Sequence, residues 1–236
     1  HPGWAAHAGL VAVALGANGF RGPATVFEGS HGFYAAHIGR IPEGEKVPAH
    51  GLGEIWLTRG LALKPYPCCH FIHAFVDAAL FLRDQAPLAD IERIDCPLSA
   101  RLHPMIAEPR ERFVRPRTIY DALFSVPYIV ALTLVRGRVD LAAFYDEPLD
   151  DPEVLGLAAR TFCEDDPESD YPDHFPGELR ITLRDGSVLQ RREPASSGTP
   201  ERRLTRRQIN EKFRLNAARA IGDDQVARVI DAVWDF

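Results

Sequence analysis

The first regular pattern along the chain is an apolar segment near its beginning. Residues 3–18 are rich in alanine, valine and leucine, and Gly19 is well placed to end a helix there. A helix over this segment would be apolar on nearly every side. We therefore predict that residues 3–18 form a helix that is buried between other helices.

Two patterns in the middle of the chain predict strands. Residues 90–97 alternate apolar and charged side chains, which is typical of a half-buried strand. Residues 178–192 predict two further strands joined at the Asp185-Gly186 dipeptide, a common hairpin turn. The acidic, proline-rich stretch before this hairpin and residues 196–198 after it are expected to be solvated linkers.

Helical patterns occupy much of the remaining chain. Pro67 suits the first turn of a helix through residue 80, and residues 120–135 predict a buried helix that is kinked or begun at Pro127. Near the end, Thr205 is placed to cap one helix, and Asp223 or Asp224 to cap a last helix through Trp234.

This order of elements predicts an α+β fold. Helices come first, mixed strands and helices follow, and helices return at the end, so we expect an α+β domain inserted between two parts of an all-helical domain. The expected division is residues 1–62 for the first part of the helical domain, 63–196 for the α+β domain and 197–236 for the returning helices.

Composition and charge narrow the class of protein. The chain has 236 residues, 46% of them hydrophobic, and a formal net charge of -6, which argues against a nucleic-acid partner. It has no apolar run long enough to cross a bilayer and no signal peptide. Four cysteines do not make a disulfide framework, so a cytoplasmic location is expected. Because the chain begins at His1 without a methionine, we expect it to be a piece of a longer polypeptide.

Arginine is the usual cation of this chain. Of 27 basic residues only Lys46, Lys64 and Lys212 are lysines. A lysine that persists in such a background suggests that a compact ammonium with a tunable pKa is needed.

The densest group of functional side chains follows Lys64 and includes Cys69, His70 and His73. If Pro67 opens a helix, Cys69, His73 and Asp77 recur at four-residue steps on one face, and Asp77 can orient His73. The amides of the first turn would then provide a seat for a carboxylate near Lys64.

Simpler interpretations of these residues stay open. The cysteines and histidines can equally be small or partly buried core residues, with Lys64 a surface cation. A zinc site is less favoured because the cysteines and histidines crowd one helix start without paired ligand spacing. Tyr128 can donate a proton to a substrate oxygen, although an aromatic residue in an apolar helix is more often in the core. The basic run 202–207 is expected to be a solvated helix face.

Four separated blocks of the sequence stand out together. They are His1-Pro2-Gly3-Trp4-Ala5-Ala6, Lys64-Pro65-Tyr66-Pro67-Cys68-Cys69 with His73-Ala74 and Asp77-Ala78-Ala79, Phe124-Ser125-Val126-Pro127-Tyr128, and Lys212-Phe213-Arg214 with Asn216-Ala217. In this order they resemble the MmgE/PrpD family, which includes 2-methylcitrate dehydratase, cis-aconitate decarboxylase and iminodisuccinate epimerase. The resemblance implies the helical and α+β domains already expected, a homodimer, and a reaction without metal or organic cofactor in the cleft between the domains.

The resemblance also implies roles for single residues. Lys64 and Tyr128 match a lysine and a tyrosine of the decarboxylase site, and His73 is expected to have a supporting acid/base or orienting role. The position of Cys69 is histidine in the decarboxylase, so this chain departs from the pattern there. The predicted substrate-binding residues are Cys69, His70, Ser125 and His1.

The expected activity is dehydration of a small polycarboxylate such as 2-methylcitrate. Epimerisation or decarboxylation within the same family, and a non-catalytic subunit, are the alternatives. Family members carry a further catalytic lysine and histidines upstream of the block that begins at His1. We therefore expect the chain alone to be inactive and to need an N-terminal helical half as its partner.

Overall fold

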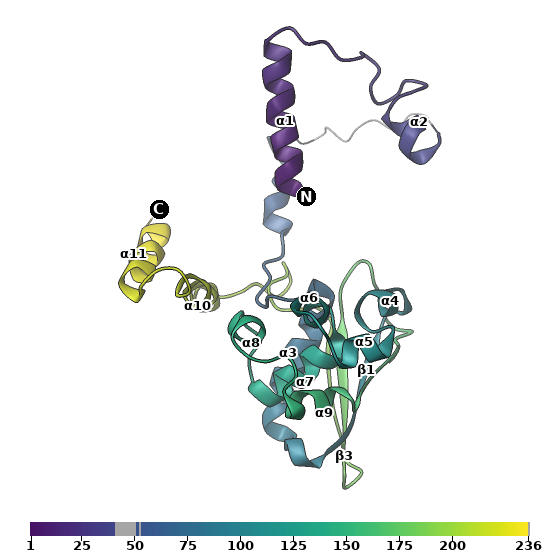
Figure 1. Ribbon diagram of the computed structural model, residues 1–236, viewed down its shortest axis with the longest axis vertical. Coiled ribbons are helices and arrows are strands. Elements are labelled where there is room, and N and C mark those ends of the chain that lie inside the picture. Colours follow the sequence, from purple (N-terminus) through teal and green to yellow (C-terminus); the bar gives the residue numbers. More distant parts are fainter. Residues whose placement is uncertain (41–50, 52, 236) are drawn as a thin grey trace. The chain divides into compact units, whose positions relative to one another are not determined.

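The computed structural model of the chain describes residues 1–40, 51 and 53–235, and these residues form two units (Figure 1). The first unit is His1–Trp56 and the second is Leu57–Phe236. No helix in the described part of the chain is long and apolar enough to span a membrane.

The first unit contains α1 (Pro2–Ala17) and α2 (Phe33–Ile38). Gly19 follows α1 with a φ of 87°, so the predicted helix and the glycine at its end are confirmed. The predicted burial between other helices is not seen among the described residues of the first unit, where Trp4, Leu10 and Val13 are 75%, 73% and 71% exposed.

The second unit is an α+β fold built on a four-stranded mixed sheet. Its strands are β1 (Ile91–Leu98), β2 (Thr161–Asp165), β3 (Gly177–Leu183) and β4 (Val188–Glu193), in the order β2-β1-β3-β4. Strand β1 runs parallel to β2 and antiparallel to β3. The predicted strand and hairpin are confirmed, and Gly186 supplies the positive φ of the turn, 84°.

Helices cover one face of this sheet (Figure 1). α3 (His73–Leu82) packs on β3 and β4, and α7 (Val126–Arg136) packs on α3, β2 and α9 (Pro152–Ala158). Phe75, Ile129 and Ile181 are fully buried between these layers. The remaining helices are α4 (His103–Ile106), α5 (Arg110–Val114), α6 (Ile119–Leu123), α8 (Ala142–Tyr145), α10 (Arg206–Ala217) and α11 (Asp223–Trp234).

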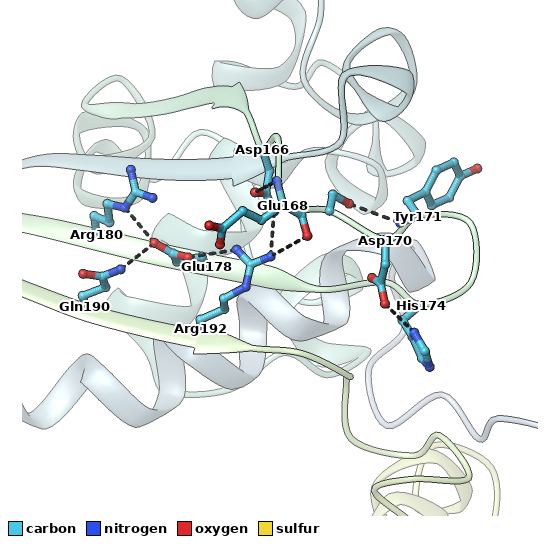
Figure 2. Close-up of polar contacts among 10 residues, drawn as sticks. Asp166, Glu168, Asp170, Tyr171, His174, Glu178, Arg180, Gln190 and Arg192 are labelled. Carbon is cyan, nitrogen blue, oxygen red and sulfur yellow. Dashed lines mark hydrogen bonds and ion pairs between the residues drawn. The ribbon is translucent and has the colours of Figure 1, made fainter.

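Charged side chains line the other face of the sheet. Glu178 on β3 accepts hydrogen bonds from Arg180 and Gln190 at 2.7 Å each and from Arg192 at 3.0 Å. Arg192 also binds Asp166 at 2.9 Å, so it joins the sheet to the loop between β2 and β3 (Figure 2). The side chain of Glu178 is only 4% exposed, and these contacts make its burial tolerable.

Helix ends agree with the sequence except in two places. Ser125 caps α7 with Pro127 in the first turn, and Thr205 caps α10 through a capping box. Pro67 does not open a helix, because Cys69 is extended and α3 begins only at His73. Gly222 rather than an aspartate occupies the cap position of α11.

Candidate functional site

The candidate site is built on the loop that leads into α3. Within it, the Lys64 ammonium donates to the Cys68 carbonyl at 3.1 Å, and the Cys69 amide donates to the Leu123 carbonyl at 2.9 Å. A short 3-10 turn, His70–Ile72, then leads into the helix. Cys69 therefore lies outside the helical face that His73 and Asp77 share, so the predicted three-residue alignment is wrong.

His73 is a buried, neutral imidazole. Its side chain has no exposed surface, and its Nε2 faces the Cys68 carbonyl at 3.4 Å. Among the described residues its Nδ1 has no hydrogen-bond partner. Burial, followed by the charge of His70, lowers the pKa of His73 to about 3. A neutral ring with that pKa is a weak base, and the acid/base and orienting roles of His73 both stay predictions.

Asp77 holds the surrounding loops rather than His73. Its carboxylate accepts from the Tyr66 hydroxyl at 2.7 Å, from the Ser197 amide at 2.6 Å and from Arg202 at 3.4 Å. The prediction that Asp77 orients His73 is therefore wrong, because both oxygens of Asp77 are already engaged.

Residues 196–198 belong to the site and are not a solvated linker. Ser196 is 1% exposed, and the Gly198 carbonyl accepts from the Leu63 amide at 2.8 Å. Gly198 has a φ of 92°, and a Cβ there would overlap the Leu63 carbonyl. Arg202 also departs from the expected solvated face, because it binds Glu193 at 2.6 Å and lies half-buried.

Lys212 reaches the loop from α10. Its ammonium donates a hydrogen bond to the Lys64 carbonyl. Burial and the charge of Lys64 both lower the pKa of Lys212. Two of the three lysines thus meet at one place, while Lys46 lies outside the described residues. The scarcity of lysine was the sequence signal for Lys212, whereas nothing in the sequence pointed to Ser197 or Arg202.

His70 lies beside the loop between β2 and β3. Its Nε2 is 3.4 Å from the Ser196 hydroxyl, and its ring packs edge-on against Phe175 with centroids 5.3 Å apart. Both residues line a cavity of about 260 Å³ together with His174. The loop that carries Phe175 and His174 is fastened to the sheet through the Arg192 contacts in Figure 2.

The two cysteines of the loop are poor nucleophiles. Cys68 and Cys69 are free and buried, and burial raises the pKa of both thiols. Within the described ranges, no group of three or more His, Cys, Asp or Glu side chains is arranged to hold a metal ion.

Tyr128 and Ser125 lie on α7 in the core. Tyr128 is 1% exposed, and burial together with Asp151 raises its pKa to about 12. The Ser125 hydroxyl donates to the Phe113 carbonyl at 2.6 Å and accepts from the Tyr128 amide at 3.0 Å. Among the described residues, no side-chain hydrogen bond or ring contact joins Tyr128 to His73 or to Lys64. Their roles stay predictions.

His1 is an exposed residue of the first unit, so its predicted substrate contact stays a prediction. A separate cavity of the second unit, of about 760 Å³, is lined by Arg115, Arg117 and Asp150 among others and by none of the predicted site residues.

Comparisons with known proteins agree with this architecture. The family model for the MmgE/PrpD C-terminal domain matches residues 66–236. The chain is 27% identical over 242 residues to a cis-aconitate decarboxylase of Mus musculus and 29% identical over 248 residues to one of Aspergillus terreus. It is 26% identical over 197 residues to a 2-methylcitrate dehydratase of Cupriavidus necator.

These similarities cover unequal shares of the proteins compared. The two decarboxylases match 99% and 98% of this chain, and the dehydratase matches 76%. The same alignments cover 48%, 50% and 39% of the relatives. The chain thus spans about half the length of the curated relatives it matches.

Proposed function

Because the chain belongs to the MmgE/PrpD family, we propose that it supplies one wall of a cofactor-free lyase site for a small polycarboxylate. The observation that carries this proposal is the Lys64 ammonium. It is held on an ordered loop by a carbonyl, and none of the ion pairs among the described residues uses it. A substrate carboxylate is the counter-charge that this position lacks.

The chemistry follows from that placement. A carboxylate bound at Lys64 brings the neighbouring carbon of the substrate to a fixed position. In dehydration, a base removes a proton from that carbon, the charge spreads into the carboxylate and is stabilised by the ammonium, and hydroxide leaves from the next carbon as the double bond forms. In decarboxylation, the bond to a second carboxylate breaks to release carbon dioxide, and the carbanion that is stabilised in the same way then takes up a proton. His73 supports the loop through the Cys68 carbonyl and stays neutral. In this proposal the general base belongs to the N-terminal helical half, which is the expected partner of this chain.

Two reactions fit this site. Dehydration of a 2-methylcitrate-like substrate is the first candidate, and the match to 2-methylcitrate dehydratase supports it. Decarboxylation of cis-aconitate is the second, favoured because the decarboxylases align with 98–99% of the chain. Cys69, where the decarboxylase pattern has histidine, counts against the second reaction. A homodimer belongs to the same proposal, and sedimentation equilibrium tests it.

The experiment is an assay of the longest polypeptide in which this chain occurs. Methylcitrate, citrate, cis-aconitate and iminodisuccinate isomers are supplied separately, and alkene formation, carbon dioxide release and change of configuration are measured. We expect turnover of one polycarboxylate, a loss of at least about 100-fold in kcat for Lys64→Met, and no turnover by the chain alone. Absence of turnover with every substrate, or near-normal turnover by Lys64→Met, contradicts the proposal.

A further inference from the structure

Lys64 and Lys212 form a pair of like charges that the fold brings together from far apart in the sequence. They are separated by 148 positions, yet the Lys212 ammonium donates to the Lys64 carbonyl. Burial and then the charge of Lys64 lower the pKa of Lys212, so the positive charge of Lys64 acts on the Lys212 ammonium. An anion bound beside both lysines would offset this unfavourable interaction.

No anion of the chain joins them. Every ion pair between described residues uses an arginine or a histidine, and neither Lys64 nor Lys212 takes part in one. The buried carboxylate of this region, Asp77, is bound by Tyr66, by the Ser197 amide and by Arg202. His73 is neutral and adds no negative charge.

Both ammoniums have N–H groups that the hydrogen bonds described above do not use. An ammonium has three N–H groups. Lys64 uses one on the Cys68 carbonyl, and Lys212 uses one on the Lys64 carbonyl. Lys64 is exposed and Lys212 is half-buried, so the remaining donors can be reached from solution. Because the Lys212 ammonium lies at the Lys64 backbone and is affected by the Lys64 charge, the free donors of the two lysines can serve the two oxygens of one carboxylate.

We propose that Lys212 is a substrate-binding residue, and that Lys64 and Lys212 together seat one carboxylate of the polycarboxylate. This inference rests on the proposed function, to which it adds a residue from α10. Lysine suits the position because its compact ammonium fits beside a second cation, whereas the flat guanidinium of the arginines used at most cationic positions of this chain is larger. The bound carboxylate removes the repulsion between the two lysines.

A different role for Lys212 has to be separated from this one. Its bond to the Lys64 carbonyl also fastens α10 to the loop, so Lys212 could act as a clamp without touching substrate. Lys212→Gln keeps a hydrogen-bond donor and removes the charge. A clamp therefore predicts ordinary binding by Lys212→Gln, and a carboxylate seat predicts weak binding.

The test measures binding of propane-1,2,3-tricarboxylate by calorimetry at low salt. This probe has neither a hydroxyl nor a double bond, so it undergoes neither dehydration nor decarboxylation. We expect Lys212→Met, Lys212→Gln and Lys64→Met each to weaken binding at least 10-fold. Arg214→Met is the matched control, since it removes a positive charge from the exposed side of the same helix, and we expect it to change binding less than twofold.

A double variant separates a shared seat from a general electrostatic effect. If both lysines hold the same carboxylate, Lys64→Met combined with Lys212→Met weakens binding little more than either change alone. If the fold-loss of affinity in the double variant equals the product of the two single losses, the lysines act as two independent charges, and the inference is overturned. Ordinary binding by Lys212→Gln, or no binding of the probe by the unaltered chain, overturns it as well.

Nuclear magnetic resonance gives an independent readout of the same contact. The chain has three lysines, so protein labelled with 13C at the lysine side chains gives three Cε signals. We expect the probe to shift the two signals that disappear in Lys64→Met and in Lys212→Met. A shift of the Lys64 signal alone contradicts the proposal that both lysines bind the same carboxylate. Binding as expected without turnover of any substrate refutes the proposed lyase reaction and leaves the seat in place.

Discussion

Lowering the pH should reduce the stability of the folded chain, because His73 is buried as a neutral imidazole. Its pKa lies at about 3 in the folded chain, whereas an unfolded histidine has a pKa near 6.5. Between these values the unfolded chain binds a proton that the folded chain does not. Burying the neutral imidazole therefore does not lower the free energy of unfolding above pH 6.5. That free energy falls as the pH falls from 6.5 towards 3.

The size of the effect follows from that difference. At pH 4 the unfolded His73 is almost fully protonated and the folded one almost fully neutral. Each tenfold preference for the protonated form corresponds to about 1.4 kcal/mol, so the unfolded chain gains about 3 kcal/mol between pH 7 and pH 4. That is a large part of the 5–15 kcal/mol or so by which domains are usually stable.

The assay is urea unfolding at several pH values for the unaltered chain and for His73→Gln. A glutamine amide can take the place of Nε2 and donate to the Cys68 carbonyl, but it does not titrate. We expect the free energy of unfolding to fall by about 3 kcal/mol more in the unaltered chain than in the variant between pH 7 and pH 4.

An exposed histidine provides the control of opposite sign. Asp170 raises the pKa of His174, so His174 contributes stability that is present below pH 6.5 and is lost as the pH rises. The variant His174→Gln should therefore not remove the acid sensitivity. Parallel stability curves for the unaltered chain and His73→Gln would refute the reasoning, because the burial of a neutral imidazole would then have no energetic consequence.

Three further predictions concern other parts of the structure. Gly198→Ala should lower stability by at least ~1–2 kcal/mol in urea unfolding because of its positive φ, whereas Gly156→Ala, in open space on α9, should raise it by ~0.5–1 kcal/mol. Glu178→Gln should cost about 3 kcal/mol because two arginines lose a buried partner, and the half-exposed Glu164→Gln less than about 1 kcal/mol. Tyr128→Phe should reduce kcat of the longer polypeptide at least 10-fold with little change in melting temperature; unchanged kcat removes Tyr128 from the site.

The regular elements were predictable because local patterns determine them. Strand alternation in residues 90–97, the turn at Gly186 and the capping box at Thr205 depend on neighbours in the sequence, and all three appear in the structure. The burial of residues 3–18 was not predictable in the same way. Hydrophobicity indicates that a helix needs partners, but not whether this chain provides them.

The site was only partly predictable because long-range contacts shape it. The cluster of Lys64, His70 and His73 was visible in one short stretch of sequence. The sequence pointed to Asp77, but the partner predicted for it is wrong, since Ser197 and Arg202 reach it from more than a hundred residues away. Pro67 can begin a helix, but the extended backbone at Cys69, whose amide binds the Leu123 carbonyl, delays the helix to His73.

The Gly198 contact with Leu63 has a consequence for how the protein is made. Gly198 follows Leu63 by 135 positions, so at ribosomal speeds of roughly 5–20 residues per second it is made about 7–27 s later. Throughout that interval the nascent chain carries the basic loop without the backbone that later fastens it. Hydrogen exchange in the loop should therefore stay fast until Gly198 has left the ribosome. A polypeptide released before that point contains Lys64 but lacks the Gly198 carbonyl that fastens the loop at Leu63.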